Sequence, residues 1–110
     1  MSEIKPVFLP ERQRFALDDQ GKIIGAAHYR DFDGPQGVER IFFHTTVDEE
    51  YAGQGLAGVL AKFALESTIE QGAKIVAVCP YIKAYTTKHH EYDEHLVKPA
   101  QAHIDVLPKG

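Results

Sequence analysis

The sequence predicts a single small α/β domain, in which a mixed, twisted sheet has helices packed on it. Turn signals rich in glycine and proline separate two apolar segments in the first third of the chain, which is typical of a β-hairpin. A strand rich in β-branched and aromatic residues follows, and a segment with apolar residues at helical spacing comes directly after it. A further short apolar strand and a second helical segment complete the expected order β-β-β-α-β-α.

The first strands are expected to form a hairpin. Residues 1–11 contain two prolines and are expected to be irregular. The segments "RQRFALDD" and "KIIGAAHYRDF" are expected to be strands, and the turn between them contains Gly21, which can adopt a positive φ. The turn "DGPQG" then leads into "VERIFFHTTV", residues 38–47. Apolar side chains on both faces of this segment favour a central strand.

The second half of the chain predicts a strand between two helices. The first helix, "LAGVLAKFALESTIEQG", has an apolar stripe and ends at Gly72. The stripe consists of Leu56, Val59, Leu60 and Phe63. "AKIVAVCP" is expected to be a short buried strand, parallel to residues 38–47 through a right-handed crossover, and "YIKAYTTKHHEYDEHL" a second helix. We expect a core at about residues 12–90 and a loosely ordered tail at residues 96–110.

Length and composition favour an ordinary globular protein. The 110 residues carry a net charge of −4, and 44% of them are hydrophobic. An acidic chain is not typical of nonspecific nucleic-acid binding, and the longest apolar segments are too short to span a bilayer. The start of the chain lacks the apolar region of a signal peptide, and Cys79 is the only cysteine. We therefore expect a cytoplasmic monomer or weak homodimer without a disulfide, and with neither nucleic acid nor membrane as a partner.

The stretch "EYAGQGLAG" contains the pattern G-x-G-x-x-G at Gly53, Gly55 and Gly58. A dinucleotide site requires a strand that runs directly into the first glycine and an acidic residue at the end of the next strand. Neither is present, because "DEEYA" separates the strand from the glycine and the next strand ends in "VAVCPYIK". A P-loop is excluded because no Lys-Ser/Thr pair follows the glycines. Two interpretations remain open: a tight strand-to-helix connection, or backbone N–H groups at a helix start that bind a phosphate.

The segment "VDEEYAGQGLAGVLAKFAL" after a hydrophobic strand resembles the acyl-CoA-binding core of the GNAT superfamily of N-acetyltransferases. The superfamily signature is Arg/Gln-x-x-Gly-x-Gly/Ala, which Gly55 and Ala57 match. Ala52 stands where the superfamily has Arg or Gln, which removes one side-chain donor. The resemblance extends over roughly residues 12–90 in element order and implies acetyl-CoA as co-substrate. The residues expected to bind it are Thr45, Thr46, Val47, Gly53, Gln54, Gly55, Leu56, Ala57 and Lys88.

The chain also resembles a compact, stand-alone branch of this superfamily, whose members lack the helices between the first two strands. The shared segments are "HTTV", "GLAGVLAKFAL" and "CPYIKAY". This resemblance implies a shortened acetyl-CoA-binding domain and does not identify the acceptor amine. In the superfamily the strand before the glycine turn and the strand after the helix separate, and the pantetheine arm lies between them. The ends of "FFHTTV" and "VAVCPY" are therefore expected to face the reacting carbon.

Three side chains near the expected gap are candidates for the chemistry. Cys79 stands at the end of the last strand, where its thiol could protonate the leaving sulfur or accept the acyl group. A buried apolar cysteine is the alternative. Tyr81 and Tyr85 share a helix face, and the resemblance implies that a tyrosine of this helix protonates the departing CoA sulfur. Packing of both rings on the sheet is the alternative for them.

A fourth candidate, His44, lies near the end of the strand at residues 38–47. Strict alternation predicts one face with Phe42, His44 and Thr46, and the other with Thr45 and Val47. A histidine at this place could deprotonate the incoming ammonium group. A hydrogen-bonded histidine without that function is the favoured alternative.

No metal is expected. The segment "HHEYDEH" is a near miss for a zinc site, because His90 and His95 are five residues apart and do not share a helix face. Together the sequence and the resemblance predict an acetyl-CoA-dependent N-acetyltransferase that moves an acetyl group to a primary amine. The alternative is a CoA or acyl-CoA binding module or sensor without efficient catalysis, which the absence of an obvious base leaves open.

Overall fold

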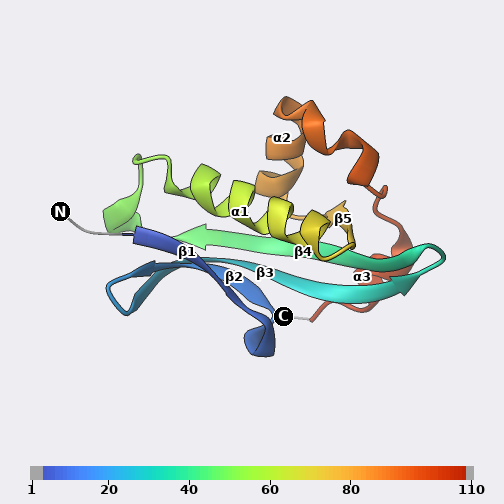
Figure 1. Cartoon of the computed structure of the whole chain (residues 1–110), viewed down its shortest axis with the longest axis horizontal. Coiled ribbons are helices and arrows are strands. Elements are labelled where there is room, and N and C mark those ends of the chain that lie inside the picture. The colour runs from blue at the N-terminus through green and yellow to red at the C-terminus, as the bar shows by residue number, and fades with distance from the viewer. Residues whose placement is uncertain (1–3, 109–110) are drawn as a thin grey trace.

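A computed structural model describes residues 4–108 (Figure 1). Its strands are β1 (Ile4–Leu9), β2 (Arg14–Asp19), β3 (Lys22–Gly34), β4 (Gly37–Val47) and β5 (Lys74–Ala77), and its helices are α1 (Leu56–Glu70), α2 (Pro80–Lys88) and α3 (Gln101–Asp105). The strands form one sheet in sequential order, antiparallel from β1 to β4, with β5 parallel to β4. The expected α/β class with a mixed sheet is confirmed. The structure adds one strand and one short helix to the expected element order.

Helices α1 and α2 lie on the same face of the sheet, and α3 lies at the hairpin end of β3 and β4 (Figure 1). Phe15, Leu17 and Phe42 of the sheet and Leu60 and Leu65 of α1 are all fully buried in one core. Full burial of such a side chain stabilises the fold by about 1.5–3 kcal/mol. The core thus fixes α1 on the sheet, and with it the glycine turn from which α1 starts.

The buried face of α1 differs in part from the expected stripe. Its buried positions are Leu60, Ala61, Ala64, Leu65 and Thr68. Val59, which was expected in the stripe, is 45% exposed. The alanines place α1 on the sheet with a narrow, small-residue face, and Leu56 and Phe63 pack only at its margin.

The expectation of an irregular segment at residues 1–11 is wrong for Ile4–Leu9, which form β1; residues 1–3 lie outside the described residues. This strand pairs with β2 along its whole length and forms the edge of the sheet. An edge strand tolerates Pro6, because one side of its backbone needs no hydrogen-bond partner. Pro10 then begins a 3-10 turn, Pro10–Arg12.

The segment expected to be one helix at residues 81–96 is divided in two. Helix α2 ends at Lys88, and His90–His95 form a 3-10 turn. The chain then runs along the free edge of β5, where the N–H of Val97 donates to the C=O of Ile75 at 2.8 Å. This pairing with β5 requires extended backbone, which ends the helical conformation.

The expectation of a loosely ordered tail is wrong for Gln101–Asp105, which form α3; residues 109–110 lie outside the described residues. His103 is 4% exposed, and its Nε2 lies 2.6 Å from Oε1 of Glu39, which is 6% exposed. The backbone N–H of Ala100 donates to Nδ1 of the same ring at 2.9 Å. These bonds hold the last helix on the hairpin of β3 and β4.

Candidate active site

Strand β4 continues beyond its pairing with β5. The pairing of the two strands ends at Phe42↔Ala77. Beyond that point the N–H groups of Val78 and Cys79 both donate to the C=O of Phe42, at 3.0 and 2.8 Å. From there to Val47, β4 pairs only with β3. The two parallel strands therefore separate after Phe42, and the last part of β4 has an edge without a strand partner in the described chain.

A β-bulge in β4 lies at the start of this unpaired part. Tyr29 pairs with Phe42 and His28 pairs with His44, which leaves Phe43 without a partner on β3. A bulge reverses the side-chain alternation of the residues that follow it. Tyr29 and Phe42 point into the core. His28 and His44 therefore point to the opposite face of the sheet.

The faces expected from strict alternation are wrong for this reason. Thr45 and Val47 lie on the helix side, where Val47 packs against the core and the hydroxyl of Thr45 contacts Cys79. His44 and Thr46 lie on the opposite side and are exposed. No glycine or proline marks the bulge in the sequence, so the alternation pattern alone could not reveal it.

Cys79 lies at the point where the two strands separate. It is the N-cap residue of α2, with Pro80 in the first turn of that helix. Its side chain is 4% exposed, and its Sγ lies 3.4 Å from Oγ1 of Thr45. The contact joins the last part of β4 to the start of α2 across the gap. Whether the thiol takes part in chemistry stays a prediction.

Two glycines of the turn before α1 adopt the left-handed backbone conformation. Gly53 and Gly55 have φ values of +81° and +73°, and a Cβ at either position would have open space around it. The left-handed conformation therefore selects glycine here, whereas packing does not. Gly55 is the N-cap of α1 without a side-chain cap, and the first intrahelical bond runs from the N–H of Val59 to its C=O.

The N–H groups at the start of α1 consequently have no acceptor within the helix. These are the groups of Leu56, Ala57 and Gly58, which precede the first intrahelical bond. The first turn holds no acidic side chain. Together with the helix dipole, such donors favour a phosphate oxygen.

An acidic surface lies between the end of β4 and this turn. Asp48, Glu49 and Glu50 line an open concavity of about 550 Å³. Glu50 accepts a bond from Nζ of Lys22 at 3.1 Å, and this contact raises the pKa of Lys22. The ion pair offsets part of the negative charge, and the rest opposes the binding of an anion nearby.

The two candidate tyrosines share a face of α2, with ring centroids 6.4 Å apart. The hydroxyl of Tyr81 approaches the first turn of α1, 3.8 Å from where a Cβ of Gly58 would stand. Tyr85 lies farther along and stacks on His89, with centroids 4.1 Å apart. Burial raises the pKa of both hydroxyls, so both keep their protons at neutral pH. Each can therefore act only as a proton donor there.

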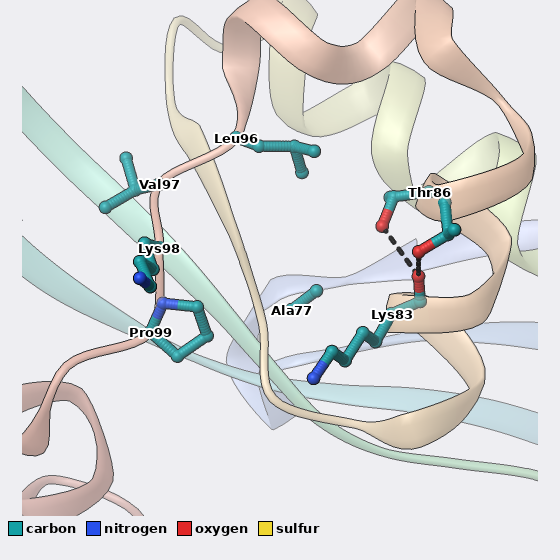
Figure 2. Close-up of a pocket in the computed structure, with 8 residues that line it drawn as sticks. Ala77, Lys83, Thr86, Leu96, Val97, Lys98 and Pro99 are labelled. Atoms are coloured by element: carbon teal, nitrogen blue, oxygen red, sulfur yellow. Dashed lines mark hydrogen bonds between the residues drawn. The ribbon is translucent and has the colours of Figure 1, made fainter.

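A second cavity, of about 370 Å³, lies at the outer edge of β5 (Figure 2). Lys83 of α2 and Lys98 border it from opposite sides, and Ala77 lies between them (Figure 2). Lys88, an expected cofactor ligand, lies at the far end of α2 from Cys79 and is exposed.

The histidine-rich segment contains pairs of titratable groups only. His90 Nδ1 lies 3.1 Å from Oδ2 of Asp93, and His95 Nε2 lies 3.6 Å from Oε1 of Glu94. No group of three or more metal-ligating side chains occurs among residues 4–108. Within the same part of the chain, no helix is both long and apolar enough to cross a membrane.

The family model described as GCN5-related N-acetyl-transferase matches residues 14–96. The match includes β2 to β5, the glycine turn, α1 and α2. The chain therefore belongs to the GCN5-related N-acetyltransferase family.

Relatives of known structure support this assignment. A GCN5-like protein from Staphylococcus aureus is 28% identical and has a TM-score of 0.60, over 92% of this chain and 93% of that chain. A ribosomal-protein-alanine N-acetyltransferase from Brucella melitensis biovar Abortus 2308 is 18% identical, with a TM-score of 0.56 over 79% of this chain and 62% of that chain. An aminoglycoside acetyltransferase from an uncultured soil metagenomic sample is 15% identical, with a TM-score of 0.55 over 71% and 53% of the two chains. The last two show the fold alone.

A curated relative matches over a shorter region. Protein NATD1 of Gallus gallus is 40% identical over 55 residues, which are 48% of this chain and 50% of that protein. The matched region thus spans half the length of that relative.

Proposed function

We propose that this protein transfers an acetyl group from acetyl-CoA to a primary amine. The observation that carries the proposal is the separation of β4 and β5 after Phe42, with Cys79 and Thr45 facing each other across the gap. The unpaired edge of β4 leads from this gap to the glycine turn, so a strand edge that could hold an extended ligand and the proposed phosphate site follow one another along the chain.

Different residues along this path would bind different parts of acetyl-CoA. The backbone from Gly53 to Ala57, including the exposed Gln54, would hold the pyrophosphate through N–H groups at the start of α1. The edge of β4 at Thr45–Val47 would hold the pantetheine arm, because a strand edge offers free N–H and C=O groups. Lys88 stays a proposed contact of the nucleotide end.

Direct transfer requires one proton donor and one proton acceptor. The amine nitrogen forms the new bond to the carbonyl carbon while the bond from carbon to sulfur breaks, and the departing thiolate takes a proton. Tyr81 or Tyr85 can supply that proton, because a phenol carries its proton at neutral pH and burial raises the pKa of each further. Cys79 is the third candidate donor, and His44 is the proposed acceptor of the ammonium proton.

A binding module without efficient catalysis is the second candidate. Two observations favour it: Ala52 replaces the side-chain donor of the superfamily signature, and the acidic concavity at Asp48–Glu50 lies beside the turn. Both weaken the retention of a pyrophosphate. In either case we propose a cytoplasmic protein that acts as a monomer or weak homodimer.

The glycine turn provides the test. We expect Gly55→Asp to weaken acetyl-CoA binding about tenfold in calorimetric titration, because its carboxylate faces the phosphates and the helix donors. Gly55→Asn has nearly the same shape and tolerance of positive φ without the charge, and it should lose much less. Gly72→Asp, at the other end of α1 with φ of +77°, controls for strain and for charge elsewhere.

Equal affinities of the folded Gly55→Asp and Gly55→Asn proteins would contradict the phosphate site. Release of CoA from acetyl-CoA, followed by thiol titration with a panel of amines, separates the two candidate functions. An enzyme accelerates the release of CoA with at least one amine. A binding module binds acetyl-CoA, but no amine accelerates the release of CoA.

A further inference from the structure

A row of basic side chains crosses the sheet on the face opposite α1 and α2. Arg14 on β2 pairs with His28 on β3, and His28 pairs with His44 on β4. Residues paired in this way on neighbouring strands point to the same face. The row therefore runs across three strands and ends at the part of β4 beyond Phe42, which does not pair with β5.

Two further side chains belong to this surface. The Phe43 ring lies 6.3 Å from the His28 ring, and the guanidinium of Arg30 lies 5.5 Å from the centroid of Phe43. The imidazoles of His28 and His44 are 5.6 Å apart. His44 is exposed, and Arg14, His28 and Arg30 are half-buried. We name Arg14, His28, Arg30, Phe43 and His44 the basic row.

The charge of this surface is opposite to that of the chain. The net charge is −4, with 16 acidic and 12 basic residues besides histidine. Burial lowers the pKa of His28, and three neighbouring basic groups, Arg14, His44 and Arg30, lower it further. No carboxylate is among the groups that perturb it. An acidic protein thus collects positive charge at the side of the gap that faces away from the helices.

We propose that the basic row binds the acceptor, and that the acceptor is a small amine which also carries a carboxylate or phosphate. This inference rests on the proposed function and specifies its substrate class. Arg14 and Arg30 bind the anionic group, and the amine reaches the gap beside His44. The row spans two strand spacings, roughly 10 Å between backbones, which suits a small molecule.

Two physical effects select this class of acceptor. Positive charge repels diamines and lysine-rich peptides, and no carboxylate is among the groups that perturb His28 in the row. An anionic group reverses that effect and brings its own amine into the surface. Once bound, the amine lies close to cations that lower its pKa, which increases the neutral fraction able to attack.

The proton balance is complete with the groups present. The first proton of the ammonium passes to the imidazole of His44 and then to solvent, to which His44 is exposed. The second proton leaves the nitrogen as the amide forms and replaces the one that a donor gave to the CoA sulfur. His28 is a positioning residue, since its neutral ring lies beside His44 and keeps a second positive charge away from it.

Matched amines test the proposal. The first pair is phosphoethanolamine and ethanolamine, and the second pair is β-alanine and propylamine. In at least one pair we expect kcat/KM for the anionic amine to exceed kcat/KM for the counterpart without the anionic group by about fivefold. The phosphate and carboxylate pairs distinguish the two anionic groups. Arg14→Gln should remove the preference by raising KM for the anionic member alone. Arg12→Gln, two residues away and exposed, should leave both amines unchanged.

Histidine resonances give a readout that does not depend on turnover. Phosphoethanolamine or β-alanine should shift the imidazole signals of His28 and His44 in NMR spectra, whereas ethanolamine and propylamine should not. Equal rates within both pairs, or unmoved signals with both anionic probes, would overturn the proposal even in an active enzyme. Shifted signals with no acetyl transfer to any amine would instead retain the anion surface and reject the proposed function.

Discussion

The two ends of β4 differ in how completely their polar groups are satisfied. At the end near the hairpin, Glu39 and Arg40 are buried, and their side chains are fully engaged. Arg40 donates two bonds to Asp31, at 2.8 and 3.1 Å, and one to Gln71 at 3.0 Å. Its guanidinium also lies 4.2 Å from the centroid of the Tyr29 ring.

The other end of β4 has the opposite character. From His44 to Val47 the strand pairs with β3 only, and its exposed side chains include His44 and Thr46. Its free edge and the uncapped start of α1 offer hydrogen-bonding groups that no described protein group uses. One strand therefore serves two purposes: its polar groups are paired internally where the strand supports the fold, and they are left available where a ligand is expected.

The largest effect is expected at the closed end. Arg40→Ala should lower the free energy of unfolding by about 3 kcal/mol, because it removes three hydrogen bonds and leaves Asp31 and Gln71 without their partner. Chemical denaturation measures the change, and Arg12→Ala is a control with an exposed arginine. The affinity for acetyl-CoA at a temperature where both variants are folded should stay unchanged. A large loss of affinity at full folding would show that the two ends are coupled.

A smaller effect is expected at the gap. Bound CoA should slow the alkylation of Cys79 about tenfold, because a pantetheine arm next to Thr45 would cover the thiol. Direct transfer further requires that Cys79→Ala keep measurable activity, and Cys79→Ser tests proton donation, since a hydroxyl is a poorer acid than a thiol. Alkylation unaffected by saturating CoA would show that the bound pantetheine arm does not cover Cys79, and its buried side chain would then serve the core alone. A trapped acetyl-cysteine, with an inactive Ala variant that still binds CoA, would replace direct transfer by a covalent route.

The sequence predicted more of the fold than of the site. Glycines and apolar periodicity predict the hairpin, α1 and the turn at Gly53 and Gly55, because these depend on local backbone preferences. The face of His44 could not be predicted, because it depends on a bulge that tertiary pairing imposes at Phe43. The sequence pattern around His28 does not indicate a functional residue either, because its proposed function depends on the strand register that places it opposite His44. The burial of His103 likewise depends on Glu39, 64 positions earlier in the chain.

The smallest effect concerns the pH dependence of stability, and it arises from His28 beside the open end of β4. Burial and nearby cations lower the pKa of His28 in the folded chain below its ordinary value of 6.5. Between these two pKa values the unfolded chain binds a proton that the folded chain does not, so stability is lost as the pH falls from 6.5 through the folded pKa.

His28→Asn should therefore flatten the pH dependence of the unfolding free energy in this window. His44→Asn removes one of the groups that lower the pKa of His28 and should flatten it in part, whereas His90→Asn, at an exposed position, should leave it unchanged. Identical slopes for the wild type and the His28 variant would show that the imidazole titrates normally. The basic row would then lack the positive potential that its geometry implies.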